Sequence, residues 1–407
     1  MKIAYLHQYF IFPDQPGGTR SYDLAKSFAE KGFDVEVISS TSDSCYNSNK
    51  RWVTIVKDNI KVHYIYLPYN NKLSYTKRII VFLKFLVYAT IKLFNIKVDL
   101  VLATSTPLTI GIPALLKKWM SKTPFVFEVR DVWPEAVIAI GAIKNLFLQN
   151  ILLQLERLIY KNASAIVPLS TDMRASILAR YPALAVKYIE VIENISEVNR
   201  FQSGAKRIDL KSIIGFVPKF SILYAGTFGK VNGIEFVVNL AAKTKLVEPK
   251  LVYLLIGEGV EKENIERMAK KRGVLGENLF LFNSISKTEL PDWYRSVSMG
   301  SSFVIDVKEL WANSANKFFD TLAAGKPILI NHGGWQAEQI RKQNIGYVLP
   351  QNLLDVDVGE FVAYALDCEI IDTQGRNALE VSKRNYSLEV AVNKYMAIFN
   401  YIKEDIY

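Results

Sequence analysis

The chain has 407 residues, of which half are hydrophobic and 22% are charged, and its formal net charge is +10. This length suits two domains, and this composition excludes a disordered or fibrous protein. Two cysteines and three histidines exclude a disulfide framework and argue against a Cys- or His-rich metal centre. The charge is uneven, because residues 1–200 have a net charge of +9 and residues 201–407 a net charge of +1. A basic half suggests nucleic acid or an anionic membrane as a partner.

The start of the chain does not resemble a secretory signal. Its short apolar run ends at the polar residues His7 and Gln8, so no hydrophobic signal region forms. We interpret residues 2–6 as a strand and expect a cytoplasmic protein, which agrees with the sparse cysteines.

Short apolar strands alternate with helical stretches through the first half. The expected strands there are 2–6, 35–40, 98–104, 124–130 and 165–170, with helices at 19–32, 113–120 and 145–160. The pattern restarts after a polar stretch at 197–218. The second half predicts strands at 220–226, 251–259, 278–283, 302–306 and 327–331, with helices at 232–245, 263–273, 287–296, 316–325 and 389–403. This alternation predicts parallel sheets with helices on both faces.

The fold class is therefore α/β, with two doubly wound Rossmann-like domains facing a cleft. We expect an N-terminal domain at 1–200, a C-terminal domain at 201–385, and a last helix at 386–407 that packs back toward the N-terminal domain. Ligands of such sheets bind beyond the carboxyl ends of the strands, so the cleft is the expected site.

One predicted helix, at residues 77–96, is apolar except for a basic stripe. Two of its lysines lie near the middle, at a cost of several kcal/mol in a bilayer, so a transmembrane span is rejected. We expect an interfacial helix on a membrane surface, and the alternative is a domain helix with lysines on its solvent edge. The proposed membrane-facing cations are Lys77, Arg78, Lys84 and Lys92.

Two loops of the first half carry candidate site residues. Gly17 and Gly18 lie in a loop that leads into a helix, where backbone N–H groups can meet an anion, although a tight turn explains the loop equally well. The segment EVRDVWPE places Arg130, Asp131 and Glu135 at the end of a strand. A carboxylate there can orient a sugar hydroxyl or accept its proton, and the alternative is a salt-bridge cluster.

Glycine turns follow two strands of the second half. In YAGTFGKVNG, Gly226 permits close approach to a diphosphate, and Lys230 is a nearby cation. Gly257 and Gly259 lie in the turn LIGEG. No GxGxxG or GxxxxGK[ST] motif occurs, so dinucleotide and P-loop readings lose support.

The most informative segment is NSANKFFDTLAAGKPILI, residues 313–330. Asn316 and Lys317 stand at a helix start, where their donors can point into the cleft, and Asp320 follows one turn later. A carboxylate in that place can accept both hydroxyls of a ribose. The NHGGW loop after the next strand suits close backbone contact with a sugar.

Together these segments resemble retaining GT-B glycosyltransferases of family four, in the branch that builds bacterial O-antigen, capsule and exopolysaccharide, and are similar to N-acetyl-L-fucosamine transferases. The resemblance covers nearly the whole chain, and its specific part is the block NKxFDxLAAGKPI. It implies a UDP-sugar in the second domain and the acceptor in the first. Gly257 and Gly259 would lie near the base, Gly17 and Gly18 near the diphosphate or sugar, and Asp131 near the reacting sugar.

The chain departs from the family pattern at several positions. Asp320 replaces a glutamate, and the first glutamate of the usual pair falls on Ala312. The usual diphosphate-binding Arg and Lys align with Thr227 and Asn232, so Lys230 or Lys317 must substitute. Arg130 stands in the place of the family's histidine.

We therefore expect a metal-independent, cofactor-free retaining transferase. It would move a sugar, such as an N-acetylated deoxyhexosamine, from UDP to a polyprenyl-diphosphate-linked glycan at the inner face of the cell membrane, without a nucleic-acid partner. A sugar-nucleotide 2-epimerase and a non-catalytic membrane-surface or nucleic-acid binding protein are the alternatives.

Overall fold

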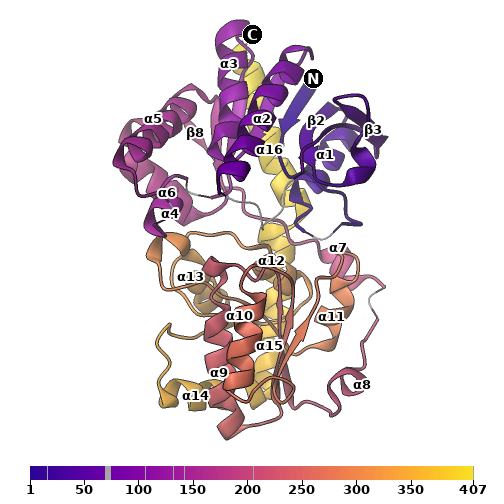
Figure 1. The fold of residues 1–407 in the computed structure, drawn as a ribbon, viewed down its shortest axis with the longest axis vertical. Helices are drawn as coiled ribbons and strands as arrows, with labels where there is room; N and C mark the ends of the chain where they lie inside the picture. Colours follow the sequence, from indigo (N-terminus) through magenta and orange to yellow (C-terminus); the bar gives the residue numbers. More distant parts are fainter. Residues whose placement is uncertain are drawn as a thin grey trace. The chain divides into compact units, whose positions relative to one another are not determined.

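The computed structural model describes residues 1–15, 17–68, 75–105, 107–131, 133–141, 143–204 and 206–406. The chain divides into two compact units (Figure 1). Unit 1 comprises residues 1–12, 19–193 and 391–407, and unit 2 comprises residues 13–18 and 194–390. The glycine loop at 13–18 thus clusters with unit 2, although we had expected it in the N-terminal domain.

Unit 1 is built around an eight-stranded sheet with the order β3-β4-β2-β1-β5-β6-β7-β8. Its strands are parallel except for β3, which pairs antiparallel with β4. The strands are β1 (Lys2–Leu6), β2 (Asp34–Thr41), β3 (Val53–Lys57), β4 (Ile60–Tyr66), β5 (Leu100–Thr104), β6 (Phe125–Val129), β7 (Ala165–Pro168) and β8 (Tyr188–Ile189). The helices of this part of the chain are α1 (Arg20–Glu30), α2 (Tyr75–Phe94), α3 (Gly111–Ser121), α4 (Glu135–Ala139), α5 (Leu146–Asn162) and α6 (Thr171–Arg180).

Unit 2 has a six-stranded, all-parallel sheet with the order β11-β10-β9-β12-β13-β14. The strands are β9 (Phe220–Ala225), β10 (Leu251–Ile256), β11 (Leu279–Phe282), β12 (Met299–Ser302), β13 (Ile328–Ile330) and β14 (Gly346–Val348). The helices are α7 (Val198–Gln202), α8 (Leu210–Ile214), α9 (Ile234–Val247), α10 (Lys262–Lys271), α11 (Leu290–Ser296), α12 (Asn316–Ala323), α13 (Trp335–Gln343), α14 (Asp355–Leu366) and α15 (Cys368–Tyr386). The expected doubly wound α/β class is confirmed.

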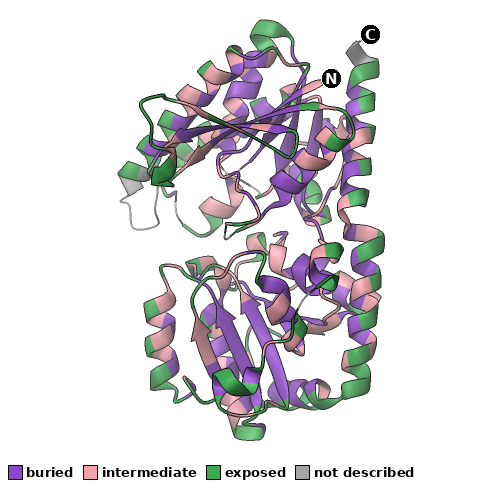
Figure 2. Cartoon of the chain, turned by 90° about the vertical axis from the view of Figure 1, so that its right-hand side faces the viewer, coloured by how far each residue is buried: buried purple, intermediate pink, exposed green. Residues whose placement is uncertain are grey.

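Both sheets are buried on their two faces (Figure 2). The strands β1, β5, β6 and β10 consist almost entirely of buried residues, as their continuous apolar sequences require. Helix α16 (Leu388–Ile406) begins in unit 2, and from Ala391 onward it belongs to unit 1. There Tyr395 and Phe399 pack edge-on against Phe28 of α1.

The strand that we had placed at 302–306 lies at Met299–Ser302 instead. Three of the four residues of this strand are glycine or serine, so its sequence lacks an apolar run. The helix that covers it explains the choice, because a Cβ on Gly300 would lie 2.1 Å from Thr321 Oγ1 of α12. Close packing, rather than hydrophobicity, therefore determines the sequence of β12.

Helix α2 has two apolar faces, of which one is buried in unit 1 and the other is exposed. Val81, Phe85 and Ala89 are buried in unit 1, whereas Leu83 and Val87 are about half exposed, at 52% and 55%. Lys77 and Lys84 are exposed, and the side chain of Arg78 lies outside the described residues. The expected continuous basic stripe is wrong at Lys92, which is partly buried with its Nζ 5.8 Å from the centre of the Trp52 ring.

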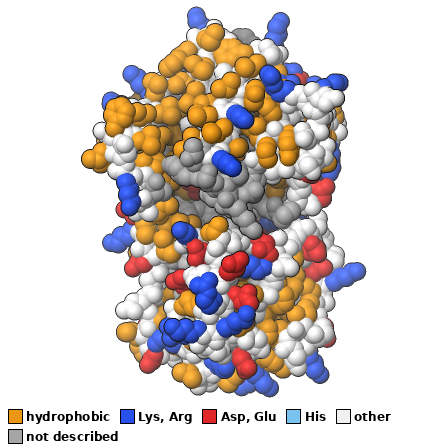
Figure 3. Space-filling model, viewed as in Figure 1, with side chains coloured by type: hydrophobic (Ala, Val, Ile, Leu, Met, Phe, Trp, Pro, Cys, Tyr) orange, Lys and Arg blue, Asp and Glu red, His pale blue; other side chains and the backbone are white. Residues whose placement is uncertain are grey.

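The exposed side of α2 continues onto two neighbouring helices. Helix α2 packs against α3, and α3 packs against α5. These helices expose further large apolar side chains, which are Ile79, Ile80, Ile91, Trp119, Met120, Leu146, Phe147, Leu148 and Ile151. Figure 3 shows hydrophobic side chains gathered on this face with lysines among them. We call this surface the α2/α3/α5 apolar face.

Glu36 on β2 makes the stability of unit 1 sensitive to acid. Lys2 Nζ lies 2.7 Å and His63 Nε2 2.9 Å from its carboxylate. Burial alone would raise the pKa of Glu36, but hydrogen bonds from Lys2 and His63 lower this pKa to about 2. Since the unfolded value is about 4.3, the stabilisation is complete above that pH and is lost as the pH falls toward 2.

We therefore predict that Glu36→Gln lowers the free energy of unfolding at pH 7 and flattens its decline between pH 5 and pH 2. Urea unfolding followed by circular dichroism at several pH values measures both effects. Glu30→Gln, an exposed carboxylate on α1, is the control and should follow the wild type. Parallel pH curves for Glu36→Gln and the wild type would contradict this account.

Candidate functional site

The carboxyl edge of the unit 2 sheet brings two predicted glycine turns together. The N–H of Gly226, after β9, donates to Ile256 O of β10, and a Cβ on Gly257 would lie 1.9 Å from Gly226 O. Gly259 is equally constrained, because its Cβ would lie 2.3 Å from Phe228 O. Gly257 and Gly259 have φ of 157° and 158°. Glycine is therefore required at both positions to bring the turns after β9 and β10 into contact.

Lys317, at the start of α12, lies against the first of these turns. Its Nζ is 3.0 Å from the position that a Cβ on Gly226 would occupy, and 4.9 Å from the centre of the Tyr224 ring. Desolvation lowers the pKa of Lys317 to about 8, and the nearby Asp320 carboxylate only partly offsets this effect. A partly desolvated ammonium beside the half-buried Gly226 backbone is an arrangement suited to a diphosphate.

Lys230 and Thr227 are arranged differently from Lys317. Both side chains are exposed in the turn after β9. The Thr227 carbonyl accepts a hydrogen bond from the Tyr224 hydroxyl at 2.8 Å, which fixes the backbone of this turn. Of the two lysines that the sequence left open, Lys317 is the one that packs against Gly226.

Asp320 is buried one turn further along α12. Its Oδ1 lies 2.5 Å from Nζ of Lys287, which is also buried. No pattern in the sequence pointed to this partner, which lies 33 residues away and precedes α11. The ion pair fixes the Asp320 carboxylate, while an aspartate retains further lone pairs for a ligand hydroxyl.

The loop at 13–18 and the start of α12 meet within unit 2. A Cβ on Gly18 would lie 2.5 Å from Nδ2 of Asn316, so a side chain at Gly18 would displace that amide. Gly17 is exposed, with φ of 135°. The structure thus brings Gly18, Asn316, Lys317 and Gly226 to the same edge of the sheet.

His332, which follows β13, is a candidate that sequence reasoning did not select. It is 2% exposed, and its Nδ1 lies 2.8 Å from Gly333 O. Desolvation lowers the pKa of His332 to about 4, so the ring is neutral at physiological pH. With Nδ1 as the donor, Nε2 is an acceptor, and no described residue hydrogen-bonds to it. The sequence could have pointed to His332 through its position, because it follows the carboxyl end of a strand in the expected sugar-binding loop.

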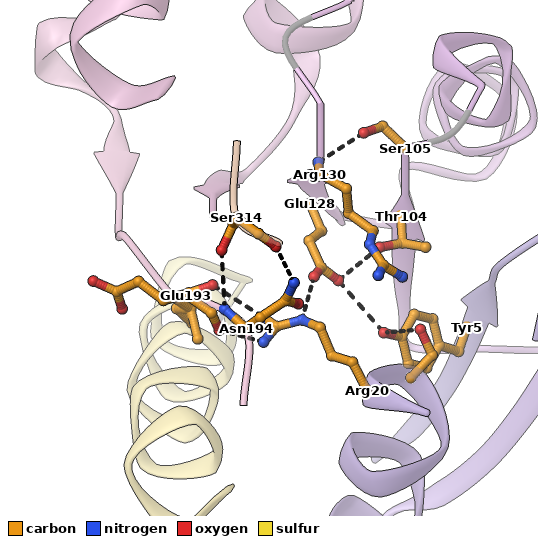
Figure 4. A network of polar contacts seen from close by, with 11 residues as sticks. Tyr5, Arg20, Thr104, Ser105, Glu128, Arg130, Glu193, Asn194 and Ser314 are labelled. Carbon is orange, nitrogen blue, oxygen red and sulfur yellow. Dashed lines mark hydrogen bonds and ion pairs between the residues drawn. The ribbon is translucent and has the colours of Figure 1, made fainter. Parts of the chain in front are cut away.

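The carboxyl edge of the unit 1 sheet holds a buried ion pair that sequence reasoning also missed. Glu128, at the end of β6, is fully buried, and its carboxylate lies 2.7 Å from Arg20 Nε of α1 (Figure 4). Thr104 Oγ1 and the Tyr5 hydroxyl donate to the same carboxylate at 2.6 and 3.4 Å. Burial alone would raise the pKa of Glu128, but Arg20 and Arg130 outweigh this effect, and the pKa is lowered.

Arg20 also ties this edge to the end of the unit. Its guanidinium donates to Ile192 O at 3.0 Å and to Glu193 O. Three strands and one further segment therefore meet at this ion pair. The strands are β1 through Tyr5, β5 through Thr104 and β6 through Glu128, and the segment is the chain at 192–193. The signal in the sequence was an arginine after Gly-Gly and a glutamate inside an apolar strand.

Arg130 follows β6 at the same edge. Its backbone N–H donates to Ser105 Oγ at 2.9 Å, which fixes the loop after β5 against the loop after β6. Its charge also acts on His7, at the end of β1. Desolvation, followed by repulsion from Arg130, lowers the pKa of His7 to about 3. Neither His7 Nδ1 nor the side-chain amide of the buried Gln8 has a hydrogen-bond partner among the described residues.

Asp131 and Glu135 have separate environments. Asp131 is exposed. Glu135, at the start of α4, accepts a hydrogen bond from Ser176 Oγ at 2.6 Å and lies 3.5 Å from Arg180 Nε. Arg180 also pairs with the buried Glu156 of α5. These contacts favour the salt-bridge interpretation for Glu135 and leave Asp131 as the carboxylate beside Arg130.

No group of three or more His, Cys, Asp or Glu side chains that could hold a metal ion occurs among the described residues. In the same part of the chain, no helix has the length and hydropathy needed to cross a membrane.

Family models match both units. A model described as a glycosyl transferase 4-like domain matches residues 17–192, and a model described as glycosyl transferases group 1 matches residues 209–379. Among curated proteins, CapJ of Staphylococcus aureus is 24% identical over 299 residues, which cover 72% of this chain and 69% of CapJ. The putative colanic acid biosynthesis glycosyl transferase WcaI of Escherichia coli strain K12 is 28% identical over 157 residues, which cover 36% of each chain.

Solved structures match the whole fold. Sucrose-phosphate synthase from Thermosynechococcus elongatus superposes with a TM-score of 0.77 at 15% identity, covering 99% of each chain. Anabaena HepE in complex with UDP-glucose gives a TM-score of 0.70 at 13% identity, covering 99% of this chain and all of HepE. The fold and the two matching family models together show that this chain is a glycosyltransferase of the GT-B fold.

Proposed function

We propose that the protein is a retaining transferase that moves a sugar from UDP to a polyprenyl-diphosphate-linked glycan. In this proposal, unit 2 binds the donor and unit 1 binds the acceptor. The resemblance of the sequence to N-acetyl-L-fucosamine transferases supports an N-acetylated deoxyhexosamine as the sugar.

One observation carries the donor assignment. The Lys317 ammonium is partly desolvated beside the Gly226 backbone, at the carboxyl edge where doubly wound sheets bind ligands. Asp320, held by Lys287, is suited to accept the ribose hydroxyls. HepE, whose fold is similar, has been solved with UDP and with UDP-glucose, which supports a UDP-sugar for this chain.

The proposed mechanism is electrostatic and uses no metal. As the bond between the anomeric carbon and the phosphate oxygen breaks, negative charge develops on the departing UDP. Lys317 and backbone N–H groups stabilise that charge. The acceptor hydroxyl attacks from the face that the diphosphate leaves, and its proton passes to the leaving phosphate, so the anomeric configuration is retained. Holding the two substrates together supplies much of the remaining acceleration.

In unit 1, we propose that Asp131 and Arg130 contact the reacting sugar and the acceptor. The neutral His7 and the amide of Gln8 are further polar groups at this edge that can hydrogen-bond a hydroxyl. The Arg20–Glu128 pair is a positioning element in this proposal, because it is buried beneath the edge and joins the ends of β5 and β6 to the chain at 192–193.

We further propose that the α2/α3/α5 apolar face rests on the inner surface of the cell membrane. A lipid-linked acceptor is confined to that surface, and apolar side chains interspersed with exposed lysines suit an anionic interface. The net charge of +9 on residues 1–200 supports the same location. DNA, by contrast, would not require large exposed apolar side chains.

Substitution of Lys317 tests whether this lysine binds the diphosphate of the donor. Lys317→Ala should weaken UDP binding about tenfold or more, because it removes a charge-assisted contact worth about 1.5–3 kcal/mol. The exposed Lys230→Ala should change the affinity less than twofold. Isothermal titration calorimetry of the two variants decides between these lysines, and the reverse order would overturn the assignment.

The pKa of Lys317 generates a second prediction. Since this pKa is about 8, the lysine is charged below pH 8, and UDP affinity should fall as the pH rises from 8 to 9. Arginine stays charged throughout this range. Lys317→Arg should therefore bind UDP with an affinity that is nearly independent of pH, and an unchanged pH dependence in this variant would exclude Lys317 as its source.

Asp131→Asn should lower kcat by about two orders of magnitude, because it removes a carboxylate that orients or deprotonates the acceptor. The affinity for UDP, which unit 2 determines, should stay within twofold of the wild type. Glu30→Gln serves as a matched exposed control. Full transfer activity in Asp131→Asn, or sugar epimerisation by the wild type when UDP-N-acetylglucosamine is supplied without an acceptor, would contradict the proposal.

Membrane docking is tested by replacing Leu83, Val87 and Ile91 together with glutamine. Binding to vesicles that contain anionic phospholipid should fall about a hundredfold, since each of the three side chains contributes on the order of 1 kcal/mol through its buried apolar area. The matched control replaces Leu246, Val247 and Val260, which are at least as exposed but belong to unit 2. Equal sedimentation of the two triple variants with vesicles would refute docking through this face.

A further inference from the structure

Unit 2 has a concave site at the amino ends of its strands. A cavity of about 760 Å³ is lined by Phe220 at the start of β9, by residues 296–298 before β12, and by Pro327 before β13. The first three turns of α15, from Cys368 to Leu379, form another wall. This is the opposite edge of the sheet from Gly226 and Gly257, so the cavity is separate from the candidate donor site.

Cations predominate in the lining of this cavity. Five basic residues face a single acidic one, Asp372; they are Arg207, Lys219, Arg295, Lys326 and Arg376. Lys219 is paired with Glu248, and Arg376 donates to Thr373. For the side chains of Arg207, Arg295 and Lys326, no hydrogen bond or ion pair is formed with the described residues. We call these three residues the amino-edge cations.

The amino-edge cations are close enough to repel one another. Lys326 is partly buried, and desolvation followed by repulsion from Arg207 and Arg295 lowers its pKa, with only partial compensation from Asp372. Arg207 and Arg295 are exposed, so solvent screens their charges, and the repulsion falls mainly on the partly buried Lys326. A bound anion would offset that repulsion, and multiple charges at one point favour an anion with more than one negative charge.

Backbone hydrogen bonds hold Arg207 in position. The N–H of Lys206 donates to Asp292 Oδ1 at 2.7 Å, and the N–H of Ile208 donates to Ser296 Oγ at 2.6 Å. Both acceptors belong to α11, which also carries Arg295. The segment on either side of Arg207 is therefore fixed to the helix of its neighbouring cation.

The positions of two of the three cations are explained by the helix ends beside them. Arg295 lies in the last turn of α11, and Lys326 follows α12, where a cation interacts favourably with the helix dipole. Arg207 belongs to neither helix terminus, and it lines the same cavity as the other two cations. Apolar lining from Phe220, Val297 and Leu379 adds a surface for a carbon skeleton.

We propose that this cavity binds a small phosphate-bearing organic molecule. Its phosphate groups contact the amino-edge cations, and its carbon skeleton lies on the apolar lining. The proposal does not rest on the donor assignment. Helix α12, however, carries Lys317 at one end, and Lys326 comes shortly after its other end, so the two sites share an element.

The test uses inorganic diphosphate as the probe and isothermal titration calorimetry on the full chain. Wild-type protein should bind diphosphate. In a Lys317→Ala background, which removes the lysine of the donor site, adding Arg207→Ser with Arg295→Ser should weaken the remaining binding at least tenfold. The matched control removes two positive charges elsewhere in unit 2, through Lys271→Ser with Arg272→Ser on and after α10 in the same background, and should change the affinity less than twofold. Lys326→Gln, tested alone, should also weaken binding.

A Lys317→Ala protein separates the two sites. Diphosphate binding at the amino edge should persist in this variant, whatever its effect on UDP. Absence of wild-type binding at millimolar diphosphate would overturn the proposal, as would equal affinities of the double variant and its matched control. Loss of diphosphate binding in Lys317→Ala would overturn it too, by moving the diphosphate to the carboxyl edge.

Discussion

Parallel strand pairing, with helices on both faces, is the constraint on which the rest of this structure depends. It buries nearly every residue of the central strands, so polar chemistry is confined to the loops at strand ends. In unit 2, the carboxyl edge receives the glycine turns and Lys317, whereas the amino edge receives the amino-edge cations. The two proposed anion sites therefore follow from one architecture, at opposite ends of the same strands.

Each unit has a buried ion pair beneath the carboxyl edge of its sheet. In unit 1, Glu128 and Arg20 connect three strands to the chain at 192–193. In unit 2, Lys287 fixes Asp320 on α12. Removing one partner of such a pair leaves a buried charge, which costs about 3–5 kcal/mol. We therefore interpret both pairs as devices that hold the loops and helix above them in one arrangement, and thereby position the groups that meet substrate.

Sequence reasoning predicted the α/β class and brought Lys317, Gly226 and Gly257 to one sheet edge, because periodicity and chain order determine where strands end. It missed the β3–β4 hairpin, although Asp58 and Asn59 form its turn with positive φ, as such turns require. It also missed Lys287, the Arg20–Glu128 pair and the amino-edge cations. Lys287 lies 33 positions from Asp320, Arg20 lies 108 positions from Glu128, and the amino-edge cations come from several separate segments. No local sequence pattern encodes such proximity.

The measurement that tests the central claim most directly is an experimental structure of the protein with UDP bound. The account predicts that the diphosphate lies beside Lys317 and the Gly226 backbone, with the ribose hydroxyls at Asp320. It also predicts that the uracil lies near the turn at Gly257 and Gly259. A UDP molecule bound instead at the amino-edge cations, with the carboxyl edge of unit 2 unoccupied, would contradict the donor assignment and the mechanism built on it.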